Sequence, residues 1–137
     1  MGAIRVKVML TNATDEALHR MKKLAKTKIR RYLADALVDT GAVRSVIPPH
    51  VQNILGVAIR STRMAEYADG RKESVGVSEG IVFELLGRET LEEALVLGDE
   101  VLLGQTFLET TDLLADCANR RLVPNPAHPD QPVLKLK

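Results

Sequence analysis

Short apolar runs separated by turn residues fill most of the second half of the sequence. The clearest of them are 57–64, 72–77, 80–86 and 91–97, with Gly, Ser or charged residues between them. Runs of this length, bounded in this way, are typical of β-strands. None approaches the roughly 18 apolar residues needed to cross a bilayer. The pattern therefore predicts a domain of many short strands and no membrane partner.

The first third of the chain predicts two strands with a helix between them. From Ile4 to Leu10 apolar residues occupy every second position, which indicates a strand with one buried face. Apolar residues then recur at helical spacing over 15–25, and Asp15 suits the positive first turn of such a helix. The next strand is predicted over 32–38.

Further short helices and a last hairpin complete the predicted elements. A helix is expected over 48–56, because proline suits a first helical turn and glycine suits the end of a helix. Another is expected over 105–111, and a hairpin over 113–123. The sum of these elements indicates an all-β domain, with a closed or barrel-like sheet and two or three short helices.

Composition supports one globular domain and excludes several other classes. The 137 residues are 45% hydrophobic and 27% charged, unlike a disordered or collagen-like chain. Cys117 is the single cysteine, so it forms neither an internal disulfide nor a metal site alone. The N-terminal strand pattern is not that of a signal peptide, which predicts a cytoplasmic protein.

Charge is distributed unevenly along the sequence. Residues 19–31 contain seven Lys or Arg and no acid, whereas 66–116 contain thirteen Asp or Glu and three bases. The basic stretch suits either a solvated face or contact with phosphates or an acidic partner. The acidic pairs Glu92-Glu93 and Asp99-Glu100 are expected as solvated residues at turns.

Other kinds of site have little support in the sequence. Four aromatic residues are too few for a platform that stacks single-stranded nucleic acid, and no nucleotide-binding glycine loop is present. The three histidines are too far apart for a short metal-binding spacing. We therefore expect no nucleic-acid partner, no cofactor and no metal.

One turn carries residue types that suit chemistry. The apolar strand 36–38 leads into Asp39-Thr40-Gly41-Ala42. The strand places a carboxylate at the start of a tight turn, where Gly41 lets the backbone pass close to an approaching group. The Gly41 N–H can also turn toward the carboxylate and hold it. An ordinary turn that ends a strand is the alternative interpretation.

The order of motifs along the chain strengthens the chemical interpretation. Those motifs are Asp39-Thr40-Gly41-Ala42, Ser45, Tyr67-Ala68-Asp69-Gly70-Arg71, Leu102-Leu103-Gly104 and Arg121–Pro126. In this order they resemble the retropepsin-like aspartic proteases, the single-domain relatives of retroviral protease, over about residues 30–126. The resemblance implies a protease domain over 1–126 with a helical insertion at about 13–29. A Pro-rich tail over 127–137 follows.

The resemblance also implies roles for individual residues. Asp39 would be the catalytic aspartate, and Thr40, Gly41, Ala42 and Ser45 would form and support the active-site loop. Thr40 would reach the partner's backbone, and Gly41 would contact substrate backbone. Tyr67, Ala68, Asp69, Gly70 and Arg71 would lie in or beside the flap, a hairpin that closes over the substrate. Leu103-Gly104 would pack beneath the Asp39 loop.

In the family that the chain resembles, two such aspartates face each other, and this chain has one Asp-Thr-Gly and about half the length of the two-domain members. The resemblance therefore implies a symmetric homodimer with one Asp39 from each chain. The implied activity is hydrolysis of peptide bonds in a peptide or protein substrate. Two carboxylates about 3 Å apart share one proton, so one acts as general base on a water and the other polarises the scissile carbonyl.

Two departures leave a second function open. Retroviral members often pair an Asp with an Arg at the positions of Val43 and Gln105, and both charges are missing here. Dimer contacts would then come from elsewhere, with 4–10 and 133–137 as candidates for an intersubunit sheet. The alternative function is a catalytically silent, protease-like module for dimerisation or peptide binding.

Overall fold

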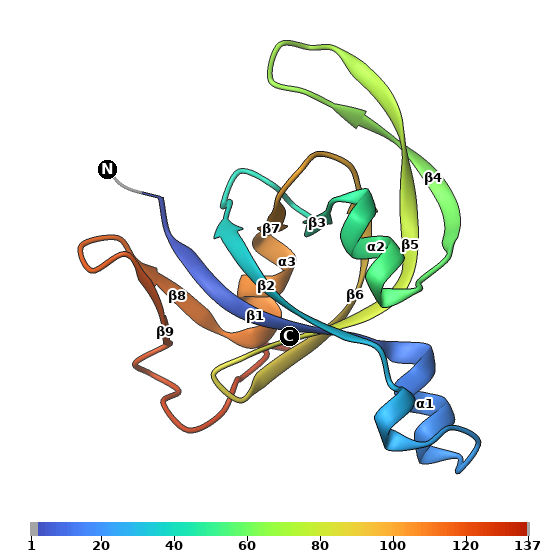
Figure 1. Cartoon of the computed structure of the whole chain (residues 1–137). Coiled ribbons are helices and arrows are strands. Elements are labelled where there is room, and N and C mark those ends of the chain that lie inside the picture. The colour runs from blue at the N-terminus through green and yellow to red at the C-terminus, as the bar shows by residue number, and fades with distance from the viewer. Residues whose placement is uncertain (1–2, 137) are drawn as a thin grey trace.

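The chain folds around a closed β-barrel. The structure is a computed structural model that describes residues 3–136. Six strands follow one another in the order β1-β2-β7-β3-β6-β5, and pairing of β1 with β5 closes the ring (Figure 1). A further strand, β4, continues the sheet beyond β5, and β8 and β9 form a separate hairpin. The predicted all-β fold with two or three short helices is thereby confirmed.

The strands are β1 (Arg5–Asn12), β2 (Arg31–Val38), β3 (Val46–Ile47), β4 (Ile59–Glu66), β5 (Lys72–Leu85), β6 (Arg88–Val96), β7 (Val101–Leu103), β8 (Leu113–Asp116) and β9 (Arg121–Pro124). The helices are α1 (Ala13–Arg20), α2 (Pro49–Leu55) and α3 (Gln105–Thr111), with a 3-10 turn at Lys26–Lys28.

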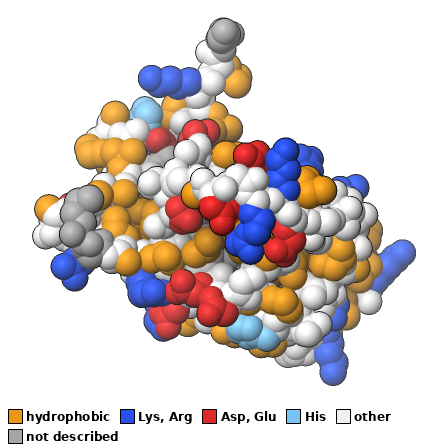
Figure 2. Space-filling model, turned by 90° about the horizontal axis from the view of Figure 1, so that it is seen from above, with side chains coloured by type: hydrophobic (Ala, Val, Ile, Leu, Met, Phe, Trp, Pro, Cys, Tyr) orange, Lys and Arg blue, Asp and Glu red, His pale blue; other side chains and the backbone are white. Residues whose placement is uncertain are grey.

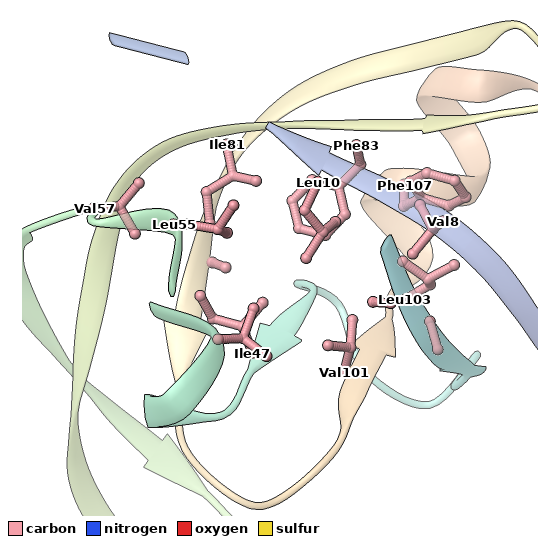
Figure 3. Packing of buried hydrophobic residues seen from close by; sticks show 14 of the residues in the cluster. Val8, Leu10, Ile47, Leu55, Val57, Ile81, Phe83, Val101, Leu103 and Phe107 are labelled. Atoms are coloured by element: carbon pink, nitrogen blue, oxygen red, sulfur yellow. The ribbon is translucent and has the colours of Figure 1, made fainter. Parts of the chain in front are cut away.

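Apolar side chains from nearly every strand meet inside the barrel (Figure 3). Leu10, Ile47 and Phe83 are completely buried there. Phe107 of α3 packs edge-to-face on Phe83, with ring centroids 6.3 Å apart. Burial of a side chain of this size contributes about 1.5–3 kcal/mol. The contact therefore fixes α3 against the barrel.

The insertion between β1 and β2 contains a shorter helix than the sequence predicts. The expected helix over 15–25 is wrong at both ends, because α1 spans Ala13–Arg20. It begins early because the Asn12 side chain accepts a hydrogen bond from the Asp15 N–H. It ends early because the chain turns away from helical geometry at Lys22, whose φ is +61°.

A buried carboxylate joins the two ends of this insertion where it meets the barrel. The Asp15 carboxylate accepts hydrogen bonds from the backbone N–H, Nε and Nη2 of Arg30, at 2.8 to 3.0 Å. The Asn12 side chain also donates to the carbonyl of Leu55 at the end of α2. Four lysines of the basic stretch remain exposed at the surface of the insertion: Lys22, Lys23, Lys26 and Lys28.

Two predicted strands are one strand in the structure. The runs 72–77 and 80–86 are both part of β5, and the pairing with β6 shifts register between Val77 and Gly80. The polar residues there form an irregularity rather than a turn, since the Glu79 N–H donates to the carbonyl of Ala58. β4 and β6 match their predicted runs within a few residues.

The C-terminal tail folds back onto the end of α3. The Asp112 carboxylate accepts hydrogen bonds from the Asn125 side chain, from His128 Nδ1 and from the Val133 N–H. These bonds, led by that of Asn125, lower the pKa of Asp112. The buried Arg88 guanidinium donates to the carbonyl of His128 and holds the tail from the other side.

The expected intersubunit strands have a different environment here. Met9–Thr11 pair with β2 on one side and with β5 on the other, so this part of the N-terminal strand has no free edge. Residues 133–136 form no strand, and Lys137 lies outside the described residues.

Candidate active site

The barrel presents the Asp39 carboxylate at the end of a central strand. β2 lies between β1 and β7, and Asp39 follows its last residue. The Asp39 N–H donates to the carbonyl of Leu103, at 2.9 Å, so the pairing with β7 continues into the turn. Asp39 Oδ1 accepts the Gly41 N–H at 3.0 Å, which is the hydrogen bond predicted from the sequence. The half-buried carboxylate is therefore held in one orientation.

The first turn of α3 holds the loop that follows Asp39. The first backbone N–H groups of a helix have no partner inside the helix. Here the N–H of Gln105 donates to the carbonyl of Ala42, and that of Thr106 donates to the carbonyl of Val43. The Gln105 side chain donates to the carbonyl of Thr40 at 2.7 Å. The loop thus caps the helix while the helix fixes the loop.

Ser45 supports the same loop from inside the barrel. Its side chain is completely buried, and its Oγ accepts the Gly104 N–H at 3.3 Å. A Cβ built on Gly104 would lie 2.7 Å from the carbonyl carbon and oxygen of Arg44 and 2.9 Å from the carbonyl of Ala42. Only glycine leaves space for this contact between α3 and the loop. Leu103-Gly104 therefore pack beneath the Asp39 loop, as expected.

The predicted flap residues form the tip of a separate hairpin. Tyr67 to Arg71 connect β4 to β5, and Gly70 has the left-handed φ of +85°. The Tyr67 N–H donates to the carbonyl of Arg71, whose guanidinium lies 4.4 Å from the centre of the Tyr67 ring. The hairpin extends beyond the barrel and curves at its tip (Figure 1). Within residues 3–136, no hydrogen bond joins this tip to the Asp39 loop.

Sequence reasoning finds the loop residues but misses several that hold them. Asp39, Thr40, Gly41, Ala42 and Ser45 do lie together in one loop. Gln105 is one of these, and its position directly after Leu102-Leu103-Gly104 is the signal that points to it.

The prediction that Glu92-Glu93 are solvated residues at a turn is also wrong. Glu92 is buried in the middle of β6 rather than solvated at a turn, with 8% of its surface exposed. Burial raises the pKa of its carboxyl group, against the opposing effects of Ser45 and Arg44. Glu93, its neighbour, is half-buried and pairs with Arg60 Nη1 at 2.6 Å.

An open apolar groove lies beside the Asp39 loop. It has a volume of about 690 Å³ and is lined mainly by α3, β8 and the tail. Thr40 and Gln105 of the active-site region contribute to it, as do Leu108 and Leu114. Seen from above, hydrophobic side chains gather on the side of the β8–β9 hairpin, whereas charged side chains dominate the middle of the face (Figure 2).

Residues 3–136 lack two further features, a cluster of potential metal ligands and a membrane-spanning helix. No cluster of three or more His, Cys, Asp or Glu side chains is arranged there to bind a metal ion. In the same part of the chain, no helix is long and apolar enough to cross a bilayer.

Two solved structures have the same fold. The retroviral protease-like domain of Ddi1 from Leishmania major aligns with a TM-score of 0.56 and 15% identity, covering 92% of this chain and 90% of that domain. EIAV protease, solved with the inhibitor HBY-793, aligns with a TM-score of 0.51 and 18% identity, covering 78% of this chain and 86% of that protein. No family model and no curated protein matches the sequence. The fold is thus that of the retropepsin-like proteases.

Proposed function

We propose that this chain, which has the fold of retroviral protease-like domains, is one half of a homodimeric aspartic endopeptidase. The observation that carries the proposal is the Asp39 carboxylate, which the Gly41 N–H orients at the end of a barrel strand. The loop that bears it is fixed by α3 through three hydrogen bonds. Such rigidity is what a reacting carboxylate needs.

A second copy of the chain would complete the site. One chain contributes one Asp39, and a symmetric pair brings two of them to the same axis. The apolar groove supports this arrangement, because it begins at Thr40 and would be covered by a partner that approaches the Asp39 loop. The Gln105 side chain, bound to Thr40, would replace the missing charged pair in bracing the loop.

The chemistry follows from two carboxylates in close contact. Because two negative charges about 3 Å apart repel strongly, the pair holds one proton. The ionised carboxylate takes a proton from a water between the two residues, and that water attacks the scissile carbonyl. The protonated carboxyl polarises the carbonyl oxygen. The flap, with Tyr67–Arg71 at its tip, would close over the substrate and exclude bulk water.

The proposal is tested with the Asp39→Asn variant. We expect it to fold and dimerise but to lose at least about 10³-fold in kcat/KM, because the general base is gone. The measurement is cleavage of a peptide library between about pH 3 and 7, with sedimentation of both proteins. Cleavage by the variant at the wild-type rate would contradict the proposal. A wild-type dimer that binds peptides without turnover would instead identify the silent binding module.

A further inference from the structure

A buried carboxyl group on β6 lies directly behind the active-site loop. The alternate residues Arg88, Thr90, Glu92 and Ala94 are buried on one face of the strand. Glu92 Oε2 is fully enclosed and has no hydrogen-bond partner within residues 3–136. A carboxylate in such a place is costly unless it is paired. The proposed reaction makes no use of this group.

The groups that act on Glu92 belong to the end of the Asp39 loop. They are the hydroxyl and backbone N–H of Ser45, and the guanidinium of Arg44. Ser45 Oγ already accepts the Gly104 N–H, so its own O–H is free to donate toward the carboxyl. Gly104 follows Leu103, whose carbonyl accepts the Asp39 N–H. The strand that bears Glu92 is also joined to the end of the loop, because the Leu95 N–H of β6 donates to the carbonyl of Ser45 at 3.1 Å.

Arg44 lies between two carboxyl groups and is bound tightly by neither. Its Nη1 is enclosed and makes no hydrogen bond within residues 3–136, and Glu93 Oε1 is 3.9 Å away. Glu93 is already engaged by Arg60 of β4 at 2.6 Å. Ionisation of Glu92 would therefore attract both Arg44 and the Ser45 N–H. Protonation of Glu92 would release them.

We propose that Glu92 is a positioning residue of the active-site loop, which holds Ser45 and Arg44 in an arrangement that depends on whether its carboxyl carries a proton. The consequence for catalysis rests on the proposed protease function, whereas the dependence of the loop arrangement on the Glu92 proton is independent of that function. The neutral form predominates in acid, where the Asp39 pair would hold its single shared proton. Protonated Glu92 thus accompanies the active arrangement.

The pH dependence has a definite sign. Because burial raises the pKa of Glu92, the folded protein keeps this proton over a range in which the unfolded chain has lost it. The free energy of unfolding therefore falls as the pH rises through that range. Arg44 and the ion pair of Glu93 with Arg60 are the charged groups around this position.

The first test compares the wild type with Glu92→Gln, which imitates the neutral carboxyl. Side-chain NMR of the wild type should show Glu92 titrating above the ordinary range for glutamate. The amide signal of Gly104, whose N–H donates to Ser45, should move with the same midpoint in the wild type, and this step should be absent in Glu92→Gln. Titration of Glu92 at an ordinary value, or a Gly104 signal that does not follow the titration of Glu92, would overturn the proposal. Neither result depends on catalysis.

Activity supplies the second test. In a profile of kcat/KM against pH, each protein is scaled to its own maximum. On the alkaline side of that profile, we expect the scaled kcat/KM of Glu92→Gln to exceed that of the wild type by at least about threefold. This difference equals a shift of the profile by about half a pH unit. Glu92→Asp, which keeps a carboxyl, should show the wild-type decrease of kcat/KM on the alkaline side of the profile. Glu89→Gln removes the same charge from an exposed position on β6 and should change nothing. Equal shifts in Glu89→Gln and Glu92→Gln would refute a specific role for Glu92.

Discussion

Two glycines beside Asp39 are required for different reasons. A methyl group on Gly104 would meet backbone atoms of Arg44 and Ala42 at 2.7 to 2.9 Å. On Gly41 it would meet only the Asp39 Oδ1 atom, at 3.3 Å. Backbone cannot move without shifting the loop away from α3, whereas a carboxylate can rotate slightly. The first position therefore governs stability and the second governs the orientation of the carboxylate.

We expect Gly104→Ala to lower the free energy of unfolding by about 1–3 kcal/mol, the usual cost of overpacking a core. Gly41→Ala should unfold near the wild-type midpoint but lose most of its activity, because the Asp39 carboxylate is displaced. Chemical denaturation and peptide cleavage, measured on both variants, separate the two effects. A Gly104→Ala protein as stable as the wild type would show that the contact between α3 and the loop is not tight.

One ion pair, between the buried Asp15 and Arg30, closes the base of the insertion between β1 and β2. The side chain of Asp15 is almost fully enclosed and accepts three hydrogen bonds from Arg30. The side-chain hydrogen bond from Arg30 is the main cause that lowers the pKa of Asp15. Its contribution to stability is therefore complete above the ordinary pKa of an unfolded aspartate, about 3.9. That contribution is lost as the pH falls through the lower value of the folded state.

Asp15→Asn should destabilise the protein by about 2 kcal/mol at pH 7, because the Arg30 guanidinium keeps its place but loses its charged acceptor. The loss should diminish as the pH falls below the ordinary pKa of aspartate, because the wild-type carboxyl, whose pKa is lowered, then also becomes protonated. Glu16→Gln is the matched control, since Glu16 makes only an exposed pair with Arg20. That pair is worth no more than about 0.5 kcal/mol. Denaturant titrations at several pH values measure the free energy of unfolding of both variants. Equal losses of stability in Asp15→Asn and Glu16→Gln would contradict the prediction.

At the scale of the whole molecule, the proposed dimer depends on the apolar groove beside Thr40. Leu114 lines this groove on β8, and 45% of its surface is exposed in the single chain. Leu91 is more exposed, at 65%, but lies on β6 outside the groove. The two leucines therefore distinguish a specific interface from general surface hydrophobicity.

Leu114→Glu should weaken dimerisation by at least about tenfold and lower activity in parallel, because a buried carboxylate would face an apolar partner. Leu91→Glu should leave both unchanged. Analytical ultracentrifugation over a concentration series, with activity followed over the same range, makes the comparison. If Leu114→Glu remains a fully active dimer, the partner docks on another face.

The sequence by itself determined the features that depend on neighbours along the chain. Alternation over 4–10 predicts a strand, because a period of two puts one face into the core, and the mostly apolar run 32–38 predicts another. The Asp39 turn and its Gly41 hydrogen bond are equally local, since they involve residues two positions apart. The identity of the fold was also accessible, because the order of the motifs carries it.

Only the tertiary structure decided how distant segments meet. It closed the barrel through β1 and β5, placed the loop carbonyls of Ala42 and Val43 on the first N–H groups of α3, and buried Glu92 behind Ser45. The physical reason is the same in each case. Hydrogen-bond partners and burial come from residues tens of positions away, and local periodicity holds no information about them.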